Sequence, residues 1–200
     1  MAKKSKFVLF DLVGVLIQDL SSKFWDNLVI KPSEQKKYVD SVTQFAQAYE
    51  HGELTTNQMI AELQELFEGR YSKKKIRSAI LAMRGGPIEG MEDVVQQVSS
   101  RCHTTLFSNT NPLHYRQALK NISFLKMLKP HFLSFKIGAL KPSPEAYQHV
   151  ITKLGCEPSE LLLIDDSRSN IAGAKACGVK AYLFRDVTRL ETQLIKLGIL

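Results

Sequence analysis

The chain has 200 residues, of which 44% are hydrophobic and 24% charged, and a formal net charge of +7; these values suit one globular α/β domain, with or without a smaller insertion. No apolar run is long enough to cross a bilayer, so we expect no membrane partner. The basic residues are scattered along the chain rather than gathered in a stripe interleaved with aromatics, so we expect no nucleic-acid partner.

The first apolar run follows a basic N-terminus, MAKKSK, and is interrupted by Asp11. No small-residue cleavage site follows in a suitable place, so we expect no signal peptide. The three cysteines, Cys102, Cys156 and Cys177, are far apart and have neither a metal-binding nor a disulfide spacing. This pattern favours a reducing compartment, and we expect a cytoplasmic protein.

Four short apolar runs are typical of buried parallel strands, and they lie at residues 7–10, 104–107, 161–164 and 180–184. Helical patterns separate them. One helix is predicted after Ser143, with Pro144 at its first position and Gly155 just past its end. The alternation of strands and helices predicts an α/β fold with a Rossmann-like parallel sheet covered on both faces.

Residues 18–84 differ, because they show helical spacing of apolar residues and no convincing strand. Three glycines follow the helical patterns as stop signals: Gly52, Gly69 and Gly85. We therefore expect a small helical cap at 18–84, inserted after the first strand, and a core made of 1–17 and 85–200. The cap is expected to set substrate choice, and Phe24 and Trp25 are candidates either for the pocket entrance or for the cap's own core.

Polar side chains follow three of the predicted strands: Asp11, then residues 108–111, then Asp165 and Asp166. Ligands of open α/β sheets bind outside the carboxyl ends of the strands. Lys141, which precedes a well-capped helix, is expected at the same edge. Each of these residues alone is more typical of a turn, a helix cap or a solvated loop. Their joint occurrence in this order indicates a functional site.

These residue types suit phosphoryl transfer. A carboxylate such as that of Asp11 can attack phosphorus and form an acyl phosphate, which splits one difficult step into two. Mg²⁺ takes oxygen ligands, and Asp11 and Asp166 could supply them. Lys141 would offset charge on the phosphoryl oxygens, and Ser108 would donate a hydrogen bond to them.

Four segments, FVLFDLVGVL, LFSNTN, GALKPSPEAY and LLLIDDSRSN, resemble the motifs of the haloacid dehalogenase-like superfamily, chiefly its phosphatases with a small helical cap. FSNTNPLH, HGEL and IDDSRSNIAGA are similar, more narrowly, to the bacterial sugar-phosphate phosphatases typified by α-D-glucose-1-phosphate phosphatase. The resemblance implies a Mg²⁺-dependent phosphatase that acts on a small phosphorylated metabolite, with a sugar phosphate as the expected substrate, through an aspartyl-phosphate.

The resemblance also implies catalytic and binding roles. Asp11 would be the nucleophile, and Lys141 would bridge Asp11 and the phosphate. Ser108, helped by Asn109, would bind the transferring phosphoryl group.

The metal site is implied in the same way. Asp11 and the backbone carbonyl of Val13 would bind Mg²⁺, with Asp166 as the main further ligand. Asp165 would contribute directly or through water, and Asn170 would help to hold the loop.

Val13 departs from the pattern, because most phosphatases of this family have a second Asp there that protonates the leaving group and activates water. Such acid–base help is worth roughly a hundred- to ten-thousand-fold in rate, so its loss slows the reaction without abolishing it. Good leaving groups, such as an anomeric sugar hydroxyl or a phenol, should be favoured. Substitute acids could come from Glu50, His51 or His114, although such residues usually belong to the surface.

Two other functions stay open. One is a pseudophosphatase that binds a phosphorylated ligand without turnover, which Val13 favours. The other is a haloacid dehalogenase, which needs no metal and has an aromatic residue at this place. It ranks lower, because Asp165 and Asp166 would repel a carboxylate substrate in the absence of a cation.

Overall fold

The computed structural model describes residues 6–200, so most of the basic N-terminus that entered the signal-peptide argument lies outside the described residues. No helix within residues 6–200 is long and apolar enough to span a membrane.

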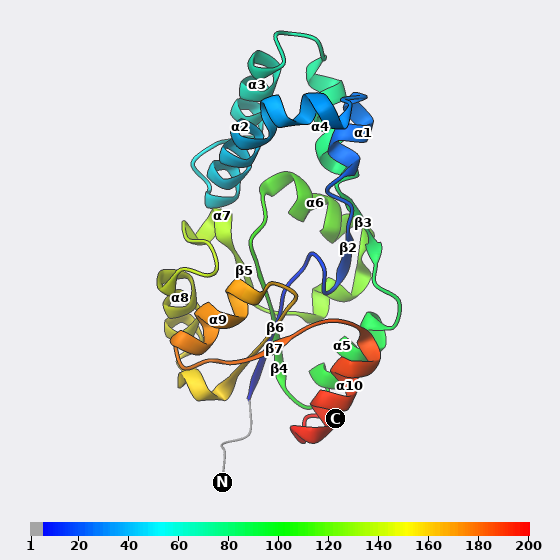
Figure 1. The fold of residues 1–200 in the computed structure, drawn as a ribbon. Coiled ribbons are helices and arrows are strands. Elements are labelled where there is room, and N and C mark those ends of the chain that lie inside the picture. The colour runs from blue at the N-terminus through cyan, green and yellow to red at the C-terminus, as the bar shows by residue number, and fades with distance from the viewer. Residues whose placement is uncertain (1–5) are drawn as a thin grey trace.

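Within residues 6–200, five parallel strands form the main sheet, which confirms the predicted α/β fold (Figure 1). Their order is β5 (His131–Leu133), β4 (His103–Ser108), β1 (Phe7–Phe10), β6 (Leu161–Asp165) and β7 (Lys180–Leu183). All four predicted strands are present. The edge strand β5 was not predicted, because three residues are too few to show an apolar pattern.

The central strand β1 is buried on both faces, which explains its unbroken apolar sequence. Val8 and Phe10 join one core cluster, whereas Leu9 joins the cluster on the opposite face. The parallel register pairs Phe10 with Leu106 of β4 and with Ile164 of β6. The carboxyl ends of these three strands therefore lie side by side, and the polar residues that follow them are neighbours.

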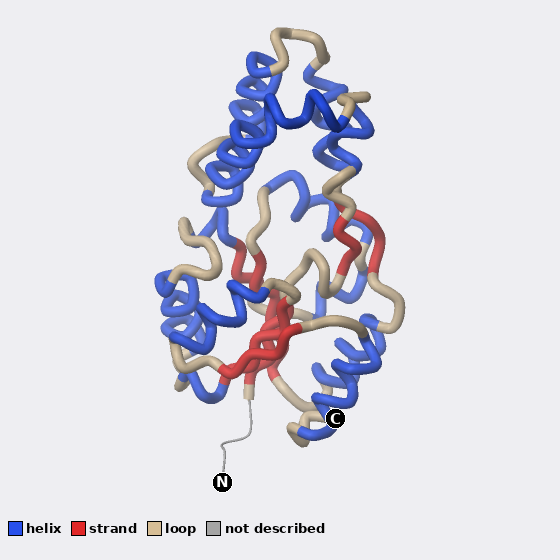
Figure 2. The backbone as a smooth tube through the Cα atoms, viewed as in Figure 1, coloured by secondary structure: helices blue, strands red, loops and turns tan. Residues whose placement is uncertain are grey.

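Helices cover both faces of the sheet (Figure 2). One face packs against α5 (Met91–Ser99), α6 (Pro112–Asn121), the 3-10 helix η1 (Ser123–Met127) and α10 (Val187–Lys196). The other packs against α8 (Pro144–Leu154) and α9 (Arg168–Ala176). Two short elements complete this part of the chain: α7 (Ser134–Ile137) and the 3-10 helix η2 (Pro158–Glu160).

A helical insertion separates β1 from α5 in the sequence and stands at one end of the molecule (Figure 1). Its helices are α1 (Lys23–Leu28), α2 (Pro32–His51), α3 (Thr56–Leu66) and α4 (Lys73–Ala82). They share an apolar cluster of their own, which includes Leu63 and Phe67 and is joined by Leu113 from α6. The insertion is therefore a packed unit that touches the core, rather than a set of surface loops.

Two short strands, β2 (Ile17–Asp19) and β3 (Arg84–Pro87), pair antiparallel where the chain enters and leaves the insertion. The sequence predicted no strand there and took Gly85 as a helix stop, and both predictions were wrong. A ribbon of three or four residues is too short to show alternation, and α4 already ends at Ala82. The division into 1–17, 18–84 and 85–200 stays a prediction, and its boundaries fall within or beside this ribbon.

His114 of α6 ties the core to the insertion. Its Nε2 donates a hydrogen bond to the carbonyl oxygen of Ile80 in α4 at 2.8 Å, and its Nδ1 accepts one from Nδ2 of Asn111 at 3.0 Å. Burial, and after it the charge of Arg84, lower the pKa of His114 to about 4. The folded protein therefore holds a neutral imidazole at this contact.

We expect the stability of the fold to decrease as the pH falls from about 6.5 to about 4. In this range the unfolded histidine binds a proton that native His114 does not bind, and the full penalty is about 3 kcal/mol. Urea unfolding at several pH values measures it. His114→Gln should be less stable than the wild type near neutral pH and should lose less stability on acidification. An equal loss in both proteins would contradict this role of His114.

Candidate active site

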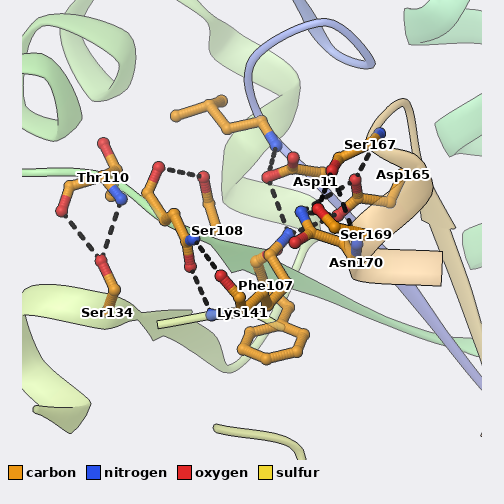
Figure 3. Close-up of polar contacts among 12 residues, drawn as sticks. Asp11, Phe107, Ser108, Thr110, Ser134, Lys141, Asp165, Ser167, Ser169 and Asn170 are labelled. Atoms are coloured by element: carbon orange, nitrogen blue, oxygen red, sulfur yellow. Dashed lines mark hydrogen bonds and ion pairs between the residues drawn. The ribbon is translucent and has the colours of Figure 1, made fainter. Parts of the chain in front are cut away.

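Lys141 lies at the centre of a charged cluster at the carboxyl edge of the sheet (Figure 3). Its Nζ is 3.1 Å from Oδ1 of Asp11 and 2.6 Å from Oδ2 of Asp165, and it donates to the carbonyl oxygen of Phe107 at 2.8 Å. The side chain is fully buried. Burial lowers the pKa of Lys141, but Asp11 and Asp165 outweigh it and the net shift is upward. The ammonium therefore stays charged between two carboxyl groups.

Asp165, the last residue of β6, is the most enclosed of the acids, with no exposed surface. Besides the lysine, it accepts hydrogen bonds from the backbone N–H of Ser167 at 2.9 Å and from Nδ2 of Asn170 at 3.1 Å. Ser167 is also the N-cap of α9. The start of this helix therefore fixes the Asp165 carboxylate, and Asn170 holds the loop as expected.

Asp11 directly follows β1. Its backbone N–H donates to the carbonyl oxygen of Ile164 at 3.0 Å, and the N–H of Leu12 donates to its Oδ1 at 2.7 Å. The pKa of Asp11 is raised to about 7, because burial raises it more than the charge of Lys141 lowers it, and the charge of Asp165 contributes to the rise. The carboxyl group is thus fixed in place but strained by its like-charged neighbour, which a nearby cation would relieve.

Asp11, Asp165 and Asp166 form an acidic cluster in which one carboxylate oxygen of each lies within 4.8 Å of the others. Asp166 is the exposed member, and burial and then Asp165 raise its pKa. Gly14 makes room for it: its φ is +81°, and a Cβ at this position would overlap the Asp166 carboxylate. Three carboxylates beside one lysine suit a divalent cation that prefers oxygen ligands, such as Mg²⁺.

Val13 lies in the turn between Asp11 and Gly14. Its side chain is half-buried and packs against the main apolar core cluster. It carries no group that could donate or accept a proton, so this turn supplies no acid for a leaving group.

Ser108 is the last residue of β4 and Asn109 follows it, and their side chains have different partners. Ser108 is 1% exposed and its hydroxyl donates to the carbonyl oxygen of Asn109 at 3.2 Å. The Asn109 amide pairs with the backbone of Lys141 through two hydrogen bonds, at 2.8 and 2.9 Å. Asn109 therefore positions the lysine loop, and its side chain is already occupied.

Sequence reasoning missed Ser134, which directly follows the unpredicted strand β5. Its hydroxyl lies 3.0 Å from the carbonyl oxygen of Thr110 and 2.6 Å from that of Glu50, and it accepts a hydrogen bond from the Thr110 N–H at 3.0 Å. This residue joins the loop after β4 to the last turn of α2. Only a prediction of β5 could have pointed to it.

The three candidate substitute acids lie in different surroundings. His51 pairs with Glu53 at 3.1 Å near the surface, and His114 is neutral and bonded on both ring nitrogens. Glu50, Arg84 and His114 line a cavity of about 310 Å³ between the insertion and the core. Because both ring nitrogens of His114 are already bonded, Glu50 is the candidate acid of the three that is best placed to meet a ligand in this cavity.

Comparison with known proteins agrees with this geometry. Residues 6–178 match the family model of haloacid dehalogenase-like hydrolases. The chain is 25% identical over 187 residues to the D-ribitol-5-phosphate phosphatase of Bacteroides thetaiotaomicron, which covers 88% of this chain and 90% of that protein. It is also 25% identical over 179 residues to the phosphorylated carbohydrates phosphatase of Thermotoga maritima, with coverage of 86% and 82%.

A magnesium complex of a haloacid dehalogenase-family enzyme from Bacteroides thetaiotaomicron shares the fold, with a TM-score of 0.83 and 25% identity over 92% of this chain and 95% of that one. Neither curated relative is named as a glucose-1-phosphate phosphatase, so the narrower resemblance stays a prediction. The family model covers most of the sequence and the fold agrees with it. The chain therefore belongs to the haloacid dehalogenase-like hydrolase family.

Proposed function

We propose that this hydrolase is a Mg²⁺-dependent phosphatase that acts on a small phosphomonoester, with sugar phosphates as the substrate class. The observation that carries the proposal is the Lys141 ammonium between Asp11 and Asp165, with Asp166 beside them. The names of both curated relatives support the substrate class, and the magnesium complex of the solved relative supports the metal.

The acidic cluster is the place for the metal. Asp11, Asp166 and the backbone carbonyl of Val13 would bind Mg²⁺. The carboxylate of Asp165 already accepts several hydrogen bonds, including those from Asn170. We therefore expect Asp165 to contact the metal ion through a water molecule. When bound, the ion would supply positive charge that lets an anionic phosphate approach a carboxylate.

Asp11 would act as the nucleophile. One of its carboxylate oxygens bonds to phosphorus while the bond from phosphorus to the ester oxygen breaks, and the released alkoxide takes up a proton. Water then attacks the aspartyl-phosphate, which releases inorganic phosphate and restores the carboxylate. Lys141 would offset charge on the phosphoryl oxygens, and Ser108 would donate a hydrogen bond to one of them. Asn109 would act indirectly, by holding the backbone of Lys141.

A pseudophosphatase is the second candidate, and the packing of Val13 against the apolar core favours it. The same phosphate and metal pocket would then bind a ligand without turnover. A haloacid dehalogenase is less favoured, because the three carboxylates would repel a haloacid.

Asp11→Asn should reduce phosphate release to background, because an amide cannot form the acyl phosphate. Phosphate release is measured with glucose 1-phosphate, glucose 6-phosphate and phenyl phosphate, with and without Mg²⁺. Asp93→Asn, at an exposed position in the first turn of α5, is the matched control and should keep full activity. If Asp11→Asn released phosphate at the wild-type rate, Asp11 would be excluded as the nucleophile. If the wild type released no phosphate, the result would favour the pseudophosphatase.

The absence of an acid at Val13 should make turnover depend strongly on the leaving group. Phenyl phosphate should be hydrolysed at least roughly a hundredfold faster than ethyl phosphate, because a phenolate leaving group needs little protonation. Val13→Asp should narrow this ratio by speeding the alkyl ester, whereas Val13→Asn should not. Equal rates on the two esters in the wild type would count against this explanation.

Mg²⁺ should stabilise the fold, because it neutralises like charges that the folded state brings together. Thermal melts with EDTA and with excess Mg²⁺ measure the shift. Asp166→Asn should lose most of the Mg²⁺-induced shift. In EDTA it should be at least as stable as the wild type, since it removes one charge beside Asp165. If Mg²⁺ shifted the melting temperature of the variant as much as that of the wild type, Asp166 would not be a metal ligand.

A further inference from the structure

The cavity between the insertion and the core is built mainly from carbon. At about 310 Å³ it is at the lower end of the range for small-molecule pockets. Its apolar wall includes Phe24, Trp25, Val42, Ala46, Met59 and Met83. Two charged side chains, Glu50 and Arg84, interrupt this wall.

Arg84 is held firmly but is not saturated. Its Nη1 donates to Oδ1 of Asp19, to the hydroxyl of Ser21 and to the carbonyl oxygen of Met83, each at 3.0 Å. Its Nε is buried and has no hydrogen-bond partner among the described residues, and the side chain is only 12% exposed. A buried donor without a partner is unfavourable, so an acceptor oxygen of a ligand that reached Nε would be favourably bound.

Glu50 has the complementary arrangement, with a fixed backbone and a free carboxyl group. Its carbonyl oxygen accepts from the hydroxyl of Ser134 at 2.6 Å, which anchors the last turn of α2 to the core. Its carboxyl group makes no hydrogen bond or ion pair with any residue in the described part of the chain. Burial raises the pKa of Glu50, and the charge of Arg84 opposes this.

The cavity lies near the proposed nucleophile. Arg84 in its wall pairs with Asp19 of β2, the strand that begins three residues after Gly14 in the turn that carries Asp11. Asn111, three residues beyond Ser108, also lines the cavity. A phosphoryl group at Asp11 would therefore place its ester substituent toward this space.

We propose that this cavity receives the leaving group of the substrate, that its apolar walls select a ring with an apolar face, and that Arg84 and Glu50 determine specificity by hydrogen bonding to oxygens at the ring edge. This inference rests on the proposed function and deepens it. An open-chain polyol carries hydroxyls on all sides and would leave some unpaired against carbon. A pyranose or an aromatic ring presents carbon faces to Trp25 and confines its oxygens to the edge.

Trp25 is the single tryptophan of the chain and lies in the cavity wall, so its fluorescence reports occupancy without turnover. Asp11→Asn is titrated in Mg²⁺ with glucose 1-phosphate, phenyl phosphate and ribitol 5-phosphate. Glucose 1-phosphate should change the fluorescence and bind about tenfold more tightly than the polyol ester. Phenyl phosphate, whose ring has no edge oxygen except that of the ester bond, should bind less tightly than glucose 1-phosphate. Equal or tighter binding of ribitol 5-phosphate, or ring binding that leaves Trp25 unaffected, would overturn the inference.

Kinetics of the otherwise wild-type enzyme separate this inference from the proposed function. Glu50→Gln and Arg84→Lys should raise KM for the ring ester about tenfold more than KM for acetyl phosphate, whose leaving group has no ring. Glu53→Gln, next to the cavity helix but outside the cavity, should change neither. Unchanged KM values for the ring ester in both variants would contradict the inference but would leave the proposed phosphatase function intact. If the wild type hydrolyses no ester, the phosphatase fails and the fluorescence titration alone decides the inference.

Discussion

The buried Lys141 ammonium is the constraint on which the rest of the site depends. An ammonium with no access to water is tolerated only where carboxylates and a carbonyl group surround it, as Asp11, Asp165 and Phe107 do here. Those partners come from three neighbouring parallel strands, so their spacing is set by the register of the sheet rather than by loops. Asn109 adds the last restraint by clamping the lysine backbone. Disturbing any partner would leave a buried charge without compensation.

Much of the fold followed from the sequence, because unbroken apolar runs and long helices with one apolar face leave clear patterns. The apolar run at 7–10 predicts a buried strand, and the glycine at 52 marks the end of α2, where its φ is +90°. The failures were short elements without an unbroken apolar run. Strand β5 and the β2–β3 ribbon have three or four residues each, and their pairing depends on partners far away in the sequence. Local pattern carries no information on such pairing.

The sequence predicted which chemical groups meet, but not how each one is used. It placed Asp11, Lys141 and the Asp165–Asp166 pair at one edge, since parallel strands end together. It did not indicate that Asn109 turns toward the lysine backbone. The sequence also could not predict that Glu50 and Arg84 line the same cavity. The two residues are 34 positions apart in the sequence, and they line one cavity only because the insertion folds back on the core.

The hydroxyl of Ser134 links the two parts of the protein to which we assign opposite ends of the substrate. On one side it holds Thr110, in the loop that continues from Ser108, and on the other it holds the backbone of Glu50. Groups that share one hydrogen-bond network contribute non-additively to binding. Under the proposed function, phosphate affinity and leaving-group affinity would therefore be thermodynamically coupled through this hydroxyl. A change in the cap that suited a new leaving group would then also alter the affinity for phosphate, which would limit how independently the two can evolve.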